Sequence, residues 1–336
     1  MGAAELLNVS DYERAAEERL DPASFGYFAG GANDEWTLRE NVAAFGRCVL
    51  RPRMLVDVST RTTATTVLGT EVSCPVLVAP VAFQGLAHPD GEKAMARGAA
   101  AAGTIMCLST LSTASLEEVA EAAPEGARWF QLYWGPDRSK VQDLVERAGA
   151  AGYRAIAVTV DLPELGRRER DLRTGFEAPS PLSNSTDDSL TWRDLEWLRA
   201  RTTLPILVKG ILTAEDAVLA LEAGAEGIVV SNHGGRQLDG VAASLDALPE
   251  VVEAAGDRAE ILLDGGVRRG TDVVKALALG ARAVLVGRAA LYGLAVDGAD
   301  GVERVLGLLR DEVELALALC GCPSPDDVTP SHVGRV

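Results

Sequence analysis

Short apolar runs alternate with helix-periodic segments eight times from residue 75 onward. The apolar runs are Val76–Ala79, Ile105–Leu108, Trp129–Leu132, Ala155–Val160, Ile206–Lys209, Gly227–Ser231, Ile261–Asp264 and Ala283–Val286. The helical segments are Gly91–Ala102, Leu116–Ala123, Arg138–Ala148, Trp192–Arg201, Thr213–Ala223, Leu245–Ala255, Thr271–Leu279 and Asp300–Leu319. Strands that are apolar throughout are covered on both faces, as in a parallel sheet. Eight such units in succession predict a closed (β/α)8 TIM barrel of the α/β class.

A doubly wound sheet is the competing architecture. Such a sheet usually carries a GxGxxG turn after its first strand, and none follows Ala79. Residues 1–74 precede the barrel, and Ser10–Leu20 and Pro22–Phe28 read as short helices packed over one end of it. We therefore expect a single domain over residues 1–336, with an N-terminal helical extension at 1–74 and the barrel at 75–320.

The chain is strongly acidic, with 32 Lys and Arg against 49 Asp and Glu and a net charge of −17. This charge repels phosphate backbones and anionic lipid, which argues against nucleic-acid and membrane partners. No apolar run approaches the roughly 18 residues of a membrane span, and the acidic N-terminal segment lacks a signal-peptide pattern. The five cysteines are odd in number and form no CxxC, which favours a reduced, cytoplasmic protein.

Polar side chains gather where the predicted strands end, which is where barrel enzymes carry their catalytic groups. In chain order these positions hold Ser109, Gln131, Tyr133, Thr159, Asp161, Arg168, Lys209, His233, Arg236 and Asp264. His233 is one of only three histidines, and a base beside fixed cations suits the removal of a proton or hydride from a small anion. The histidines show no metal-ligand spacing. Neither GxSxG nor the Walker motif is present, which argues against acyl transfer and nucleotide hydrolysis.

Glycine–arginine pairs follow the last two strands. Asp264-Gly265-Gly266-Val267-Arg268 comes after the seventh, and Gly287-Arg288 after the eighth. In barrels these two loops often form a phosphate cradle at a helix N-terminus. Glycines let backbone N–H groups approach the phosphate oxygens, and arginine adds charge-assisted hydrogen bonds to them. We expect a phosphate here, from either a substrate or a cofactor.

At these residues the chain resembles the FMN-dependent 2-hydroxy acid oxidases, a family that includes glycolate oxidase, lactate oxidase and the mandelate and hydroxymandelate enzymes. The resemblance runs from about Asn8 to Cys322. It is carried by FAGGANDEWTLREN, APVAFQGLAHPDGE, FQLYWGPDR, VTVDLPELGRRERD, PILVKGILTAEDA, SNHGGRQLDG and LLDGGVRRGTDVVKALALGA, of which SNHGGRQLD is highly specific. It implies a barrel that binds FMN, usually as a homotetramer, and converts a 2-hydroxy acid to a 2-keto acid.

The resemblance also implies roles for individual residues. It makes His233 the catalytic base, with Asp161 as its partner and Tyr133 at the substrate hydroxyl. It places the substrate carboxylate on Arg168 and Arg236, helped by Tyr27. Residues implied to contact the flavin ring are Pro80, Val81, Ala82, Ser109, Gln131, Thr159 and Lys209. Those implied to contact the ribityl-phosphate arm are Asp264, Gly266, Arg268, Gly287 and Arg288.

Two departures from the family pattern bear on the reaction. Leu111 stands where glycolate oxidase has tryptophan, which leaves room for a bulkier substrate and favours an aromatic, mandelate-like 2-hydroxy acid. The lid after the fourth strand, residues 174–191, is short, polar and acidic, so reduced flavin is more open to oxygen. We therefore expect an oxidase that reduces O2 to H2O2. A dehydrogenase that uses a quinone or carrier protein is the alternative, and a non-redox FMN barrel isomerase is a weaker one.

Overall fold

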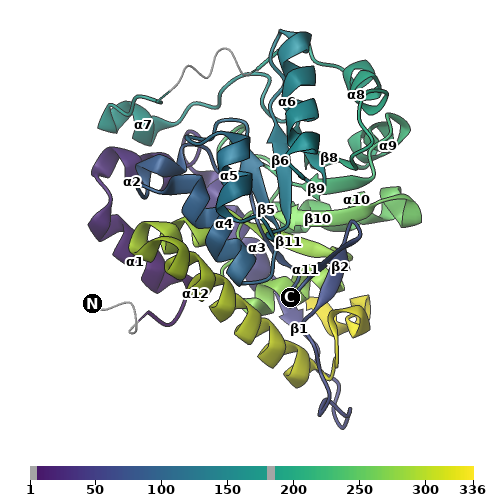
Figure 1. The fold of residues 1–336 in the computed structure, drawn as a ribbon. Coiled ribbons are helices and arrows are strands. Elements are labelled where there is room, and N and C mark those ends of the chain that lie inside the picture. Colours follow the sequence, from purple (N-terminus) through teal and green to yellow (C-terminus); the bar gives the residue numbers. More distant parts are fainter. Residues whose placement is uncertain (1–5, 180–185) are drawn as a thin grey trace.

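A closed barrel of eight parallel strands forms the centre of the molecule, as the sequence predicts (Figure 1). The computed structural model describes residues 6–179 and 186–336. The barrel strands are β4 (Val76–Val78), β5 (Met106–Ser109), β6 (Arg128–Leu132), β7 (Ile156–Thr159), β8 (Ile206–Ile211), β9 (Gly227–Val230), β10 (Glu260–Asp264) and β11 (Ala283–Val286). They close in the order β10-β11-β4-β5-β6-β7-β8-β9. Each of the eight apolar runs thus forms the strand expected of it.

The strands are apolar along their whole length because both of their faces are buried. Leu207, Val229 and Leu262 belong to the cluster that fills the barrel interior. Their neighbours Val208 and Ile228 belong to the larger cluster between the barrel and its surrounding helices. Successive side chains on a strand point to opposite faces, so a strand enclosed by core on both sides needs an apolar residue at every position.

Helices follow the barrel strands along the chain. They are α4 (Gly91–Ala101), α5 (Leu116–Ala122), α6 (Arg138–Ala150), α7 (Glu169–Thr174), α8 (Trp192–Arg199), α9 (Ala214–Glu222), α10 (Ser244–Ala255), α11 (Gly270–Ala278) and α12 (Arg288–Cys320). The last element, α12, has two helical parts, and the sequence reading lacked the first. This part begins at Arg288, directly after β11, and helical dihedrals are interrupted at Asp297 and Gly298. The expected segment Asp300–Leu319 is the part after this break.

The N-terminal extension contains the two expected helices, α1 (Val9–Arg19) and α2 (Pro22–Ala29), and a third, α3 (Trp36–Gly46), that the sequence did not reveal. Asn8 and Asp21 cap the first two helices through their side-chain oxygens. The start of α3 is held by a residue that is distant in the sequence. The Asp239 carboxylate accepts hydrogen bonds from the backbone N–H groups of Trp36 and Thr37. Packing with the barrel therefore defines this helix.

Three short strands of the extension and one at the C-terminus lie outside the barrel. They are β1 (Cys48–Leu50), β2 (Thr65–Val67), β3 (Thr70–Val72) and β12 (Val333–Arg335). β1 pairs with β12, and β2 pairs with β3 as a hairpin. Val67 and Val72 of the hairpin are buried with the side chains of the barrel interior. The extension thus supplies a hairpin to the barrel interior as well as the expected helices.

The connection after β7 contains α7, which contacts α2 of the extension. Residues 180–185, in the middle of the expected lid at 174–191, lie outside the described residues. Short 3-10 turns lie at Gln84–Leu86, Gly256–Arg258, Pro325–Asp327 and Pro330–His332. No helix among residues 6–179 and 186–336 is both long and apolar enough to cross a membrane.

Candidate functional site

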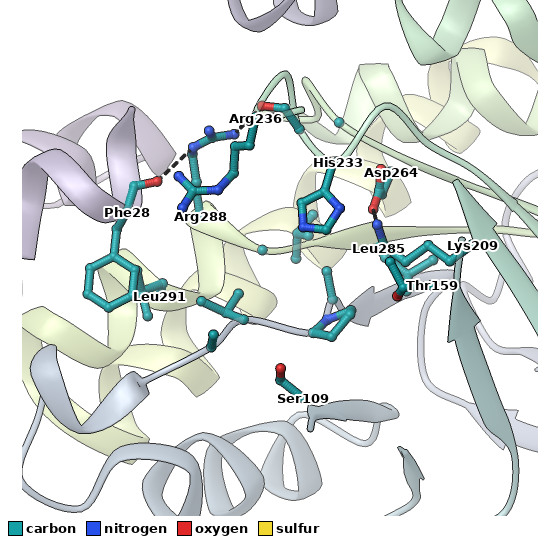
Figure 2. A pocket seen from close by; sticks show the side chains of 18 of the residues that line it. Phe28, Ser109, Thr159, Lys209, His233, Arg236, Asp264, Leu285, Arg288 and Leu291 are labelled. Atoms are coloured by element: carbon teal, nitrogen blue, oxygen red, sulfur yellow. Dashed lines mark hydrogen bonds and ion pairs between the residues drawn. The ribbon is translucent and has the colours of Figure 1, made fainter. Parts of the chain in front are cut away.

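One cavity at the C-terminal ends of the barrel strands gathers nearly all the residues singled out from the sequence (Figure 2). The expected site residues that line it are Tyr27, Pro80, Val81, Ala82, Ser109, Leu111, Tyr133, Thr159, Arg168, Lys209, His233, Arg236, Asp264, Gly266, Arg268, Gly287 and Arg288. Asp161 and Gln131 are not part of the lining but hydrogen-bond to residues that are. In Figure 2 the His233 ring lies between Arg236 and Arg288 on one side and the Lys209–Asp264 pair on the other.

The His233 imidazole is held between a carboxylate and a phenol. Its Nδ1 lies 2.9 Å from Oδ1 of Asp161, and its Nε2 lies 3.3 Å from the Tyr133 hydroxyl. A neutral ring that donates Nδ1–H to Asp161 keeps Nε2 as an acceptor. Burial lowers the pKa of His233, and the facing Asp161 opposes this effect only in part. The ring is therefore neutral at pH 7, and Nε2 is an acceptor that faces the Tyr133 hydroxyl and can take a proton.

Asp161 lies directly behind the histidine, because β8 makes room for it. Pairing of β8 with β9 shifts register between Lys209 and Ile211, and Gly210 at this irregularity has a φ of 115°. A Cβ atom at Gly210 would lie 2.7 Å from Cβ of Asp161, so a larger residue would displace the carboxylate. Burial raises the pKa of Asp161, but His233, Lys209 and a backbone hydrogen bond together outweigh burial, and the net pKa is lowered. The group is a carboxylate at neutral pH.

A buried ion pair joins the ends of β8 and β10. Nζ of Lys209 lies 3.0 Å from Oδ2 of Asp264 and 2.9 Å from Oγ of Ser231. Burial lowers the pKa of Lys209, but Asp264 and Asp161 outweigh it and the net pKa is raised. The other Asp264 oxygen, Oδ1, is buried and has no hydrogen-bond partner among the described residues. The cavity therefore has a fixed ammonium group, that of Lys209. Beside it lies Oδ1 of Asp264, which can accept a hydrogen bond from a ligand.

Three polar side chains form a chain across β5, β6 and β7. The Ser109 hydroxyl donates to Oε1 of Gln131 at 3.1 Å, and Nε2 of Gln131 donates to the Thr159 hydroxyl at 3.0 Å. Ser109 and Thr159 line the cavity, with Gln131 bonded between them. Pro80, Val81 and Ala82 follow β4 and form an apolar stretch of the same wall. A polar row and an apolar wall are typical of a pocket for a flat heterocycle.

Four arginines line the cavity without an ion-pair partner in the part of the chain that the structure describes: Arg168, Arg236, Arg268 and Arg288. Arg288 donates to the carbonyl oxygens of Phe28, Gly30 and Gly234. Burial, and then the neighbouring Arg236, lower the pKa of Arg288 to about 9 and that of Arg168 to about 10. The one carboxylate in the lining, Asp264, is paired with Lys209, so these arginines face the cavity without a counter-ion and favour an anionic ligand.

Tyr27 of α2 forms the side of the cavity next to these arginines. The guanidinium of Arg236 lies 4.9 Å from the centre of the Tyr27 ring, and its Nη1 donates to the Tyr27 and Gly30 carbonyl oxygens. The Phe176 ring, from the segment after α7, stacks on Tyr27 with centroids 4.3 Å apart. Leu111 lines the cavity from the loop after β5. The site is thus completed by the N-terminal extension and the start of the lid.

The expected phosphate corner lies between β10, β11 and the N-terminus of α12. Gly266, Arg268, Gly287 and Arg288 all line the cavity there. Gly266 has a φ of 83°, and a Cβ atom on it would lie 1.9 Å from the carbonyl oxygen of Asn41 in α3. Close packing of α3 is therefore sufficient to require glycine at this position. Gly266 also lines the cavity, and its expected contact with a phosphate stays a prediction.

Several lining residues were not assigned to the site from the sequence. Phe28, Leu162, Leu165, Gly234, Val267, Leu285 and Leu291 also face the cavity. Most are apolar residues that a sequence reading assigns to the core. The aromatic Phe176, isolated in a polar segment, is the one missed contact that could have been suspected from the sequence. The described residues contain no cluster of His, Cys, Asp and Glu suited to a metal.

A family model described as FMN-dependent dehydrogenase matches residues 16–186 and 178–335. The chain belongs to the FMN-dependent dehydrogenase family. The two matched stretches meet at the short lid. Glycolate oxidase 3 of Oryza sativa subsp. indica is 52% identical over 98% of this chain and 96% of that protein. Glycolate oxidase of Spinacia oleracea is 50% identical over the same shares.

Solved structures of this family superimpose closely on the chain. A crystal structure of mandelate oxidase with (S)-2-phenylpropionate has a TM-score of 0.93 and 46% identity, and covers 98% of both chains. The structure of mandelate oxidase with benzoyl-formic acid has a TM-score of 0.92 and 46% identity, again over 98% of both chains. FMN is the cofactor of an FMN-dependent dehydrogenase. The residues present fit it, since the unpartnered Asp264 oxygen suits a ribityl hydroxyl and the Arg288 corner suits a phosphate.

Proposed function

We propose that this FMN-dependent oxidoreductase, which acts on the CH–OH group of 2-hydroxy acids, oxidises a bulky or aromatic 2-hydroxy acid to its 2-keto acid and reduces O2 to H2O2. The observation that carries this proposal is the set of groups around one cavity. A neutral histidine is backed by a buried carboxylate, and it lies beside arginines that have no counter-ion among the described residues. The names of the relatives, glycolate oxidase and mandelate oxidase, support the oxidase reading.

The arginines bind and orient the substrate. Arg168 and Arg236 hold its carboxylate, with the Tyr27 ring packed under Arg236. A carboxylate gripped by planar guanidinium groups is fixed in orientation as well as position. This fixation sets the α-carbon and its hydroxyl against Nε2 of His233 and the hydroxyl of Tyr133, which lie 3.3 Å apart. Proximity and orientation of this kind remove much of the entropic cost of the reaction.

His233 takes a proton from the substrate at Nε2. Asp161 stabilises the imidazolium that forms, because its carboxylate is already bonded to Nδ1. Burial raises the pKa of Tyr133, so its phenol stays protonated and donates a hydrogen bond throughout. Proton transfer by a positioned base of this type contributes roughly 10²–10⁴-fold to a rate.

The residues that would hold FMN divide into two groups. Pro80, Val81, Ala82, Ser109, Gln131, Thr159 and Lys209 would hold the ring, and Asp264, Gly266, Arg268, Gly287 and Arg288 would hold the ribityl-phosphate arm. When bound, FMN supplies the two-electron redox chemistry. Lys209 contributes a permanent positive charge, since its pKa is raised. That charge would stabilise negative charge beside it when FMN is bound.

The preference for a bulky substrate is supported by the apolar side of the cavity. Leu111, Leu162 and Leu165 line it, and leucine at position 111 leaves space that a tryptophan would fill. The mandelate oxidase structures support the same preference, whereas the sequence relatives are glycolate oxidases. A panel of 2-hydroxy acids of both hands, assayed for peroxide, tests it. Rates that favour glycolate over mandelate by a wide margin would refute it.

The final electron acceptor is tested separately. The protein should be yellow, bleach anaerobically with its substrate and recolour in air within seconds to minutes. Reoxidation that takes many minutes would instead support a dehydrogenase that uses a quinone or carrier protein. A colour that does not bleach with any 2-hydroxy acid would support a non-redox FMN isomerase.

The base is tested by His233→Asn. We expect this variant to keep its flavin and to lose roughly 10²–10⁴-fold in turnover, which is the usual contribution of a general base. Glu164→Gln is a matched control, because Glu164 lies on the loop after β7 with an exposed side chain. Full activity in the His233 variant would refute the site assignment.

We further infer a homotetramer in a reducing compartment, the cytoplasm. Met54 and Leu55 are 70% and 106% exposed, and Leu315 and Leu319 of α12 are 60% and 65% exposed. Exposed apolar side chains in such number suit an interface between copies. All five cysteines are buried and free, which suits a reducing environment. Light scattering of the wild type and of Leu55→Asp tests the assembly, and a monomeric wild type would exclude it.

A further inference from the structure

Ser231 connects two parts of the site that the chemistry uses separately. It follows directly after β9 and is fully buried, with 0% of its surface exposed. Its Oγ lies 2.9 Å from Nζ of Lys209 and 3.0 Å from the backbone N of His233. Both neighbours are donors, so both acceptor positions of the hydroxyl are in use. Ser231 itself does not line the cavity.

The backbone of His233 needs this support. His233 has a φ of 58°, in the left-handed region, and Gly234 and Gly235 continue it with φ of 63° and 73°. A non-glycine residue in this region is strained. The bond from His233 N to Ser231 Oγ is a side-chain-to-backbone bond of the kind that stabilises tight turns. It fixes the turn that directs the imidazole toward Asp161.

The ammonium of Lys209 needs the same hydroxyl. It has three N–H donors, of which one reaches Asp264 and one reaches Ser231. These two bonds fix the orientation of the ammonium group. Because Lys209 lines the cavity, the third N–H is left to face the cavity. Ser231 thus sets the direction of the ammonium as well as the backbone of the base.

We propose that Ser231 is a positioning residue that sets the placement of the catalytic histidine and of the flavin-facing lysine together, through one hydroxyl group bonded to both. This inference rests on the proposed function, since it takes His233 as the base and Lys209 as a flavin contact. Neither role requires Ser231 to touch the substrate or the cofactor. The flavin environment and the base are then coupled, so a change at the hydroxyl disturbs both.

The test compares Ser231→Ala with Ser231→Thr, which keeps the hydroxyl, and Ser231→Cys, which keeps the size but is a weak acceptor. Ser244→Ala is the matched control, because Ser244 is also fully buried while its hydroxyl has no partner among the described residues. In the Ala and Cys variants we expect anaerobic flavin reduction by substrate to slow about tenfold, as expected for lost hydrogen bonds to buried donors. The flavin reduction potential should become more negative. The Thr variant should recover both properties, and the control should match the wild type.

A second readout follows the base itself in the flavin-free protein. The chain has only three histidines, His88, His233 and His332, so histidine NMR signals can be assigned by substitution. The charged groups that act on His233 are Asp161, Lys209 and Arg168, and of these Asp161 raises its pKa. If the turn loosens and the ring moves away from Asp161, the pKa of His233 should fall further in Ser231→Ala and be restored in Ser231→Thr.

The outcomes separate the two proposals. Three results together would overturn the role of Ser231. In Ser231→Ala the rate of flavin reduction would stay within twofold of the wild type, the flavin potential would be unchanged, and the pKa of His233 would stay within a few tenths of a pH unit. If the Ala variant does not fold, a Cys variant that behaves as the wild type overturns it instead. His233→Asn, assayed in parallel, tests the proposed function. If it too retains full activity, the proposed function fails and not only the coupling.

Discussion

Asp161→Asn tests how much the buried carboxylate contributes to the base. Its Oδ1 lies 2.9 Å from Nδ1 of His233, and the two side chains are only 13% and 16% exposed. Two unit charges about 4 Å apart attract by about 4 kcal/mol at an effective dielectric constant near 20. An amide can keep the hydrogen bond to Nδ1 but carries no charge. We therefore expect a loss of up to about 4 kcal/mol of stabilisation of the imidazolium, which is up to about a thousandfold in flavin reduction by substrate.

The pH dependence distinguishes charge from mere orientation. Asp161 raises the pKa of His233 against the lowering effect of burial. Without the charge, the pKa of His233 falls, so the base stays neutral to lower pH. The acidic limb of the rate profile should therefore move to lower pH while the plateau rate drops. Protonation of the base cannot explain such a loss, since the variant base is harder to protonate.

Stopped-flow flavin bleaching under anaerobic conditions, measured from pH 5 to 9, provides the assay. Glu164→Gln, an exposed carboxylate on the same loop, should leave both rate and profile unchanged. A plateau within threefold of the wild type, with the acidic limb in its original place, would refute the electrostatic role of Asp161. A plateau that drops without movement of the limb would assign Asp161 an orienting role only.

Three further changes test other parts of the site. Arg236→Lys should raise KM about tenfold or more with a smaller effect on kcat, because a point charge cannot reproduce the planar fork; equal KM values in steady-state assays would argue against carboxylate binding there. Leu111→Trp should lower kcat/KM for mandelate relative to glycolate by about 10–100-fold, by filling the apolar side of the cavity; an unchanged ratio would place the substrate side chain elsewhere. Glu92→Gln should lower the free energy of unfolding by about 2 kcal/mol, because the buried carboxylate accepts bonds from Gln84 N, Thr113 N and the Thr113 hydroxyl; denaturant titration measures this, and a loss below 0.5 kcal/mol would contradict it.

The barrel could be predicted because its signal is local. Each of its strands is a short apolar run followed by a helical period, and eight of these leave few alternatives. α3 (Trp36–Gly46) has no such signal, since its start is held by Asp239, about 200 positions away in the sequence. The hairpin strands β2 and β3 have three residues each, too few for a two-residue period to stand out. The sequence reading also lacked the first part of α12, which a break at Asp297 and Gly298 separates from the rest of the helix.

The sequence placed the expected site residues at one mouth and paired Asp161 with His233, but it did not reveal most of the other contacts. Strand-end positions bring His233, Lys209 and Asp264 to one mouth of any such barrel, and family resemblance assigned their roles. The hydroxyl link through Ser231 and the backbone carbonyls that bind Arg288 depend on side-chain directions, which a sequence does not show. Gly266 has a second reason to be glycine that the sequence does not show, because α3 packs against the position expected to contact a phosphate.

The carbonyl oxygens of Tyr27, Phe28 and Gly30 in the N-terminal extension accept hydrogen bonds from Arg236 and Arg288. The smallest fragment able to turn over substrate therefore includes the leading helices, and a barrel excised at residue 75 would carry its anion-binding arginines without their anchors. Engineers who permute this scaffold or graft it onto another protein should keep residues 27–30 joined to their barrel contacts and open the chain elsewhere.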